Sequence, residues 1–139
     1  MLPSGERLRK AGLFQRVYSA RKSVSSEQLS LYVLARQARS APGLPLAGFV
    51  VSKKVHARAS DRNLTKRRVR EAYRLLRLSM AEGGEAALAF QQLNLEQWYA
   101  IVWVIQGNLL DKTWAEVNQN VVNCLVKANQ KHGSKRVSK

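Results

Sequence analysis

A dense run of cationic side chains lies between residues 53 and 77. It contains ten lysines and arginines but only two acids, Asp61 and Glu71, so its net charge is +8 in 25 residues. Guanidinium and ammonium groups bind phosphate oxygens and displace the counterions of a polyanion. This chemistry predicts that the protein binds the phosphate backbone of a nucleic acid and does not read its base sequence. The alternative is a basic face that only keeps the protein soluble. The ten are Lys53, Lys54, Arg58, Arg62, Lys66, Arg67, Arg68, Arg70, Arg74 and Arg77.

A helix over residues 62–77 would gather these charges on one edge. At about 100° per residue, an apolar face forms that is expected to pack on a sheet. It consists of Thr65, Val69, Ala72, Tyr73 and Leu76. A stripe of four cations runs beside it, namely Arg62, Lys66, Arg70 and Arg77, and Arg67 and Arg74 continue it outward. Such a stripe can follow a phosphate backbone, because each arginine binds two oxygens in a fixed fork.

Three aromatic side chains could offer stacking surfaces. Phe14 and Tyr18 are four residues apart, so they share one edge of a helix predicted over residues 8–20, and Tyr32 lies in the next apolar run. Aromatics at such spacing are usually core residues. They can also stack nucleic-acid bases, because every base has a face to stack on. The residues alone leave both interpretations open.

The sequence offers little for catalysis by the protein itself. Its nine acids are scattered, His56 and His132 are far apart, and Cys124 is the only cysteine. A metal-dependent nuclease would need clustered carboxylates, and acid-base chemistry would need an oriented histidine. We therefore expect no catalytic residue, no metal site and no internal disulfide.

Composition predicts one basic domain. The chain has 139 residues and a net charge of +15, of which residues 1–77 carry +14. We expect a single domain over residues 1–139, with an ordered core at about 8–128 and mobile tails at 1–7 and 129–139. The longest apolar run, residues 98–105, is far shorter than the roughly 20 residues that span a bilayer. A soluble cytoplasmic protein without membrane contact is the expectation.

Apolar patterning predicts an α+β sandwich in the order α-β-β-(loop)-α-β-α. After the first helix, residues 30–36 and 46–52 are expected to form an antiparallel pair of strands. Either Asp61 or Asn63 can cap the second helix, which should run to about Met80. Residues 85–97 fit either an extra helical turn or an extended loop.

The C-terminal half should supply the innermost strand and a last helix. Residues 98–105 are continuously apolar, which is typical of a strand covered on both faces. Thr113 and Glu116 form a candidate capping box for a helix that follows residue 111. We assign four further side chains to the core: Phe49, Trp103, Trp114 and Cys124.

The sequence resembles the protein subunit of bacterial ribonuclease P. In that family a strand ends in Ser-Lys-Lys, and after a short loop a helix opens Arg-Asn-Arg-x-Lys-Arg and continues Arg-Glu-x-aromatic-Arg. This chain has VSKK at 51–54 and DRNLTKRRVREAYR at 61–74, and upstream Phe14, Val17, Tyr18 and Tyr32 match as well. The resemblance covers about residues 8–80. Leu64 replaces the third residue of Arg-Asn-Arg, so Arg67 or Arg68 would share its role, and uncharged Gln-Gly-Asn at 106–108 replaces the family's basic residues after the last strand.

The resemblance implies an α-β-β-β-α-β-α sandwich with a small central sheet and a left-handed βαβ crossover. It also implies that a catalytic RNA subunit, with Mg²⁺ held mainly by RNA, removes the 5′ leader of precursor tRNA, and that one protein assists each RNA. No DNA partner is implied. The leader would bind Phe14, Tyr18 and Tyr32. The RNA subunit would bind Lys53, Lys54, Arg58, Arg62, Asn63, Lys66, Arg67, Arg68, Arg70 and Arg74.

Other classes fit less well. A small basic ribosomal or structural RNA-binding protein without a role in tRNA processing is the main alternative. A DNA-binding protein would need base-reading residues on a recognition helix, and an RNA-recognition motif would need more than the fragment Gly48-Phe49-Val50. A nuclease made of protein alone would need the catalytic groups that are missing.

Overall fold

The structure is a computed structural model, and it describes residues 7–36, 44–82 and 95–132. The element order is α1 (Ala11–Ser19), β1 (Ser23–Ser26), β2 (Leu29–Ala35), β3 (Leu46–Val51), α2 (Ala59–Glu82), the short 3-10 helix η2 (Leu95–Gln97), β4 (Trp98–Ile105) and α4 (Trp114–His132). The α+β class and the order α-β-β-β-α-β-α are confirmed. The predictions for residues 1–6, 83–94 and 133–139 lie outside the described residues.

The four strands form one mixed sheet in the order β1-β2-β4-β3. β4 pairs antiparallel with β2 and parallel with β3, so it is the inner strand that its continuous apolar sequence predicted. The predicted pairing of residues 30–36 with 46–52 is wrong, because β4 lies between these two strands. Burying β4 on both faces and along both edges accommodates its apolar residues better than an outer position would.

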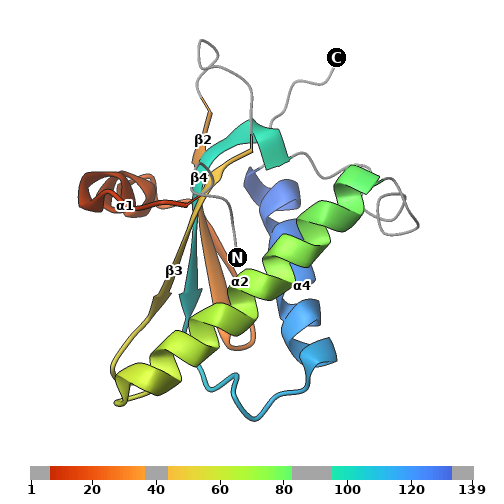
Figure 1. The fold of residues 1–139 in the computed structure, drawn as a ribbon. Coiled ribbons are helices and arrows are strands. Elements are labelled where there is room, and N and C mark those ends of the chain that lie inside the picture. The colour runs from red at the N-terminus through yellow and green to blue at the C-terminus, as the bar shows by residue number, and fades with distance from the viewer. Residues whose placement is uncertain (1–6, 37–43, 83–94, 133–139) are drawn as a thin grey trace.

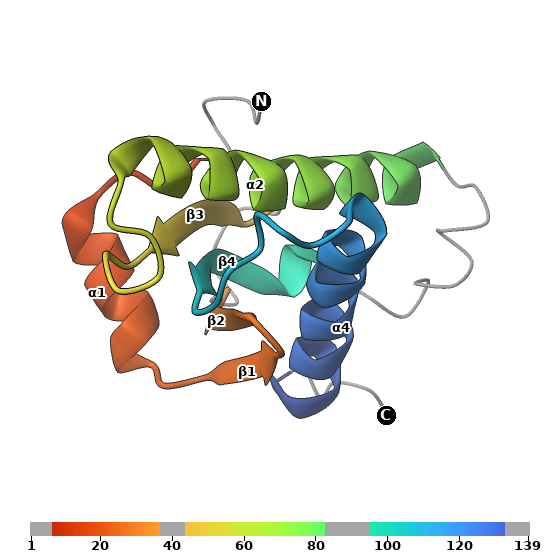
Figure 2. The same cartoon turned by 90° about the horizontal axis from the view of Figure 1, so that it is seen from below.

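Helices cover both faces of the sheet. Figure 1 shows α1 on one side of the strands and α2 with α4 on the other. Alternation along each strand divides the side chains accordingly: in β2, Leu31 and Val33 join the larger core with α2 and α4, whereas Tyr32 and Leu34 face the smaller core under α1. In Figure 2 the chain between β3 and β4 passes through α2, which lies across one face beside α4.

Local details differ from the sequence predictions at several points. α2 begins at Ala59, so neither Asp61 nor Asn63 is its cap. The strand at 23–26 was not predicted from patterning, because SVSS has little apolar alternation. α4 includes residues 129–132, which were assigned to the mobile tail.

The predicted core is mostly correct. Trp103 and Cys124 are fully buried, and Phe49 is partly buried against the larger core. Trp114 was expected to be buried but is 41% exposed, because it is the first residue of α4 and precedes the face that begins at Val117. The capping box is confirmed: Thr113 N–H donates to Glu116 Oε1 at 2.9 Å, and Glu116 N–H donates to Thr113 Oγ1 at 3.1 Å.

Candidate nucleic-acid interface

The predicted cations cluster where β3 leads into α2. Lys53, Lys54 and Arg58 lie in the exposed connection between these elements, and Asn63 and Arg67 are exposed on the first turns of the helix. The other five predicted contacts on α2 are partly buried. These five are Arg62, Lys66, Arg68, Arg70 and Arg74.

Arg62 stabilises the chain at the entry to α2. Its Nη1 donates to the carbonyl oxygens of His56 at 3.1 Å and Ala57 at 2.8 Å. The guanidinium is a planar fork with five N–H donors, so these two bonds leave donors that can bind a phosphate. Arg62 therefore fixes the loop that carries Arg58 while it retains donors for a ligand.

Arg70 and Arg74 also have partners within the protein. The guanidinium carbon of Arg70 lies 5.5 Å from the centre of the Phe49 ring, a cation–π contact between α2 and β3. Arg74 Nε donates to Glu71 Oε1 at 3.0 Å, and the hydrogen bond from Arg74 lowers the pKa of the Glu71 carboxyl. Glu71 thereby offsets part of the positive charge at this end of the stripe.

Arg68 has a different environment from Arg67. Its Nη1 donates to three carbonyl oxygens in the loop before α4, those of Leu109 at 2.8 Å, Leu110 at 3.2 Å and Lys112 at 3.1 Å. Adjacent residues on a helix point about 100° apart, so Arg68 faces α4 while Arg67 is exposed. The sequence could not separate these two arginines.

Six of the predicted contacts form no hydrogen bond or ion pair with another described residue through their side chains. They are Lys53, Lys54, Arg58, Asn63, Lys66 and Arg67. Five of the six are cations, and all six lie within 15 residues of chain around the β3–α2 connection. This concentration of unneutralised charge is the strongest candidate for binding phosphates.

The structure brings Tyr18 and Tyr32 together on the opposite face of the sheet. Their ring centres are 5.1 Å apart and the ring planes meet at 86°, an edge-to-face contact. Tyr18 is 37% exposed, and its pKa is raised by burial of the hydroxyl and by the neighbouring Tyr32. Phe14, one turn earlier on α1, is partly buried in the small core beneath that helix.

A polar hollow at the carboxyl ends of β3 and β4 was not predicted. It has a volume of about 520 Å³ and is lined by Ser52, Lys54, Val55, Val104, Ile105, Gln106, Gly107 and Asn108. Gln106 Oε1 accepts from Ser30 Oγ at 2.7 Å, and Asn108 Oδ1 accepts from the Leu110 N–H at 2.9 Å. Both carboxamide oxygens are thus engaged, so their NH₂ groups and Lys54 make the hollow rich in donors. The sequence signal that could have indicated this hollow is the position of its polar residues: Lys54 follows β3, and Gln106 and Asn108 follow β4, which is parallel to β3.

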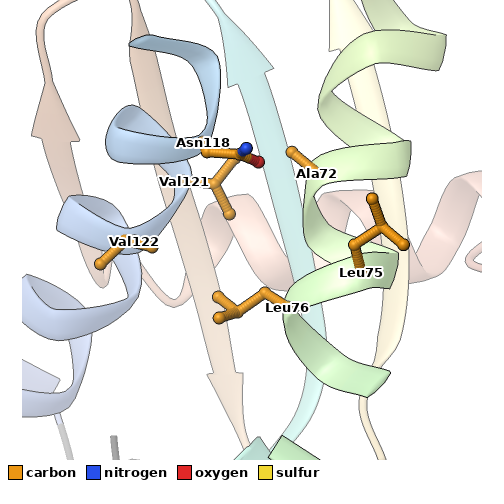
Figure 3. Close-up of a pocket in the computed structure, with 6 residues that line it drawn as sticks. All are labelled: Ala72, Leu75, Leu76, Asn118, Val121 and Val122. Atoms are coloured by element: carbon orange, nitrogen blue, oxygen red, sulfur yellow. The ribbon is translucent and has the colours of Figure 1, made fainter. Parts of the chain in front are cut away.

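A second hollow, between α2 and α4, has a different character. It has a volume of about 210 Å³, and Figure 3 shows the side chains that line it: Ala72, Leu75, Leu76, Asn118, Val121 and Val122. Five of these six are aliphatic and none is charged, so this hollow is unsuited to phosphate. We do not include it in the candidate nucleic-acid interface.

The described residues do not gather the groups of a metal centre. Among residues 7–36, 44–82 and 95–132, no three His, Cys, Asp or Glu side chains lie close enough together to hold an ion. In the same residues, no helix is both long and apolar enough to cross a membrane.

A mixed sheet with exposed cations at one edge and a tyrosine pair on one face defines a small basic α+β protein suited to bind nucleic acid. The sequence model of the family named Ribonuclease P matches residues 2–129. This chain belongs to the Ribonuclease P protein family.

Individual relatives agree with this assignment. A protein named "Ribonuclease P protein component" from Clostridium novyi is 32% identical over 127 residues, which cover 91% of this chain and 96% of the relative. One of the same name from Chromohalobacter salexigens is 48% identical over 73 residues, covering 52% of this chain and 55% of the relative. The solved RNase P protein of Staphylococcus aureus has the same fold, with a TM-score of 0.62 at 20% identity over 91% of this chain and 98% of that one.

Proposed function

We propose that this chain is the protein component of a bacterial ribonuclease P, the ribonucleoprotein that removes the 5′ leader from precursor tRNA. The observation that carries the proposal is the family match over residues 2–129, within which the unneutralised cations cluster at the motif around residues 51–74. The RNA subunit carries out the cleavage, with Mg²⁺ held mainly by RNA, and one protein assists each RNA in the cytoplasm.

The RNA subunit binds the surface around the β3–α2 connection. Lys53, Lys54, Arg58, Asn63, Lys66 and Arg67 supply side chains that no other described residue engages. Arg62, Arg70 and Arg74 contribute as well, each from a position that an internal contact fixes. Arg68 was expected in the same set, and its three carbonyl partners, all bound through Nη1, give it mainly a structural role. Its remaining donors make it a secondary contact for RNA.

The single-stranded leader lies on the other face, against α1. Tyr18 offers an exposed ring, and Tyr32 supports that ring from the sheet at 5.1 Å. Stacking tolerates any base, which suits a leader of variable sequence. The two RNA surfaces therefore lie on different elements and can be disrupted separately.

Reconstitution tests the function. The purified chain is added to a bacterial ribonuclease P RNA at low Mg²⁺, and cleavage of precursor tRNA is measured. We expect stimulation that weakens steeply with salt. A chain that binds RNA but does not stimulate cleavage would instead be a structural RNA-binding protein.

The paired substitution Lys66→Ala with Arg67→Ala tests the RNA-subunit surface. Each phosphate contact contributes about 0.7–0.9 to the slope of log affinity against log salt, so the double variant should lose about 1.4–1.8 of that slope. Lys127→Ala with Lys131→Ala removes the same charge from α4 and serves as the control. An equal change of slope in both variants would indicate non-specific attraction by net charge alone.

Tyr18→Ala tests the leader surface. One lost stacking platform costs on the order of 1–3 kcal/mol, or about 5- to 150-fold in affinity for precursor tRNA with a leader, and affinity for mature tRNA should hardly change. Thermal unfolding of the same variant identifies a general loss of structure. If both tRNAs lose affinity equally and the melting temperature falls strongly, Tyr18 is a packing residue and the leader binds elsewhere.

A further inference from the structure

Gly48 occupies an unusual place under α1. It lies in β3 opposite Val102 of β4, and Val102 lies opposite Tyr32 of β2, so the three residues form one row across the sheet. All three belong to the face that α1 covers. The row changes in size from a tyrosine through a valine to no side chain at all.

The helix α1 matches this gradient of size. Tyr18 contacts Tyr32 at one end of the row, and Phe14, one turn earlier, lies over Gly48 at the other. Val17, between them in sequence, is fully buried in the same small core as Val102. Phe14, Val17 and Tyr18 therefore attach α1 to the sheet along this one row.

Contact at Gly48 leaves no room for a side chain. A Cβ at this position would lie 2.6 Å from Phe14 Cζ, 2.7 Å from Phe14 Cε1 and 3.3 Å from Leu8 Cδ2. The backbone of Gly48 is not in the left-handed region, so any residue could adopt its conformation. Glycine is needed here for space and not for its dihedral angles.

We infer that Gly48 is a positioning residue. Because it has no side chain, the Phe14 ring packs directly on its backbone, and this contact holds Tyr18 against Tyr32 in the leader-binding surface. The inference rests on the proposed function only where it concerns the leader. Phe14 is then an anchor rather than a stacking platform, and Tyr18 presents the exposed ring. A methyl group at residue 48 forces the Phe14 ring away from the sheet. Turning the ring about χ2 does not relieve the contact with Cζ, because Cζ lies on that rotation axis. The χ1 angle has only discrete wells, so the ring retreats together with α1, and Tyr18 moves with the helix.

Gly48→Ala is the direct test, and Gly12→Ala is its matched control. Gly12 lies in the first turn of α1, and a Cβ there would meet no atom within 4 Å. The nuclear Overhauser effect between the ring protons of Tyr18 and Tyr32 reports on their contact without any RNA. We expect Gly48→Ala to abolish this effect and to lower the preference of the assembled enzyme for leadered over mature tRNA by about fivefold or more, the loss of one stacked base. Gly12→Ala should leave both unchanged.

The double variant Gly48→Ala with Phe14→Leu separates positioning from loss of fold. Leucine lacks the tip of the ring that the new methyl group would meet, so we expect the contact between Tyr18 and Tyr32 to return. If Gly48→Ala keeps the contact between Tyr18 and Tyr32, or if the double variant folds but does not regain this contact, the inference is overturned.

The placement of α1 by Gly48 and the binding of the leader by Tyr18 and Tyr32 can be tested separately. Loss of the ring contact in Gly48→Ala, restored in the double variant, supports the positioning role whatever happens to tRNA binding. If leader preference stays normal while the contact is lost, the proposed leader surface is wrong and the role of Gly48 in placing α1 stands.

Discussion

Arg67 and Arg68 give the sharpest test of how the structure divides the cationic helix. Arg68 Nη1 faces three carbonyl oxygens in the loop before α4, at 2.8, 3.2 and 3.1 Å. One such nitrogen carries two hydrogens, so we count about two full hydrogen bonds from a charged donor, roughly 1.5–3 kcal/mol each. The side chain is only partly buried, and water can replace part of these bonds. We therefore expect Arg68→Ala to reduce the free energy of unfolding by about 2–3 kcal/mol.

Urea unfolding measures this loss. With a slope of about 1–3 kcal/mol per M, a loss of about 2–3 kcal/mol should lower the midpoint by about 0.7–3 M. Arg67→Ala, the control with the same change of charge one residue earlier, should stay within about 0.5 kcal/mol of the parent protein. In an RNA-binding assay without urea, the order of the two effects should reverse. Arg67→Ala should weaken the affinity for the RNA subunit more than Arg68→Ala does. Equal stability of the two variants would refute the structural role of Arg68.

Three further predictions concern stability and reactivity. Thr113→Ala should cost about 1 kcal/mol at neutral pH through loss of the helix cap. The hydrogen bond that the Thr113 backbone N–H donates to the Glu116 carboxylate is the largest cause that lowers the pKa of Glu116. The stabilisation by this carboxylate is therefore present above the ordinary carboxyl value of 4.5 and should fade in acid unfolding as pH falls through the lowered pKa. Burial raises the pKa of the Cys124 thiol to about 12, so a thiol-alkylating reagent should leave the folded protein unmodified at neutral pH and react after unfolding. Because that pKa is raised, stability should fall between pH 9.0 and about 12, and Cys124→Ala should flatten this part of the stability curve.

The sequence predicted the elements whose residues carry their own periodicity. The apolar run at 98–105 indicated an inner strand, the spacing of Val69, Ala72 and Tyr73 indicated the buried face of α2, and Thr113 with Glu116 indicated the start of α4. These features depend on neighbours within one or two turns of chain, which sequence spacing describes directly. The concentration of charge at residues 53–77 is likewise a property of local sequence, and it pointed to a nucleic-acid partner before any fold was known.

The pairing of strands and the division of the arginines required the tertiary structure. Strands β2 and β3 are consecutive in sequence, yet β4 separates them, because a partner almost 50 residues further along buries more apolar surface between them. Arg67 and Arg68 have the same chemistry and adjacent positions, and only the loop at residues 109–112, folded back beside α2, engages one of them. Gly48 has no side chain, so no pattern of residue types along the sequence could indicate that the Phe14 ring packs on its backbone. In each case the deciding contact joins residues far apart in the chain, and its existence depends on a packing that spacing along the sequence does not encode.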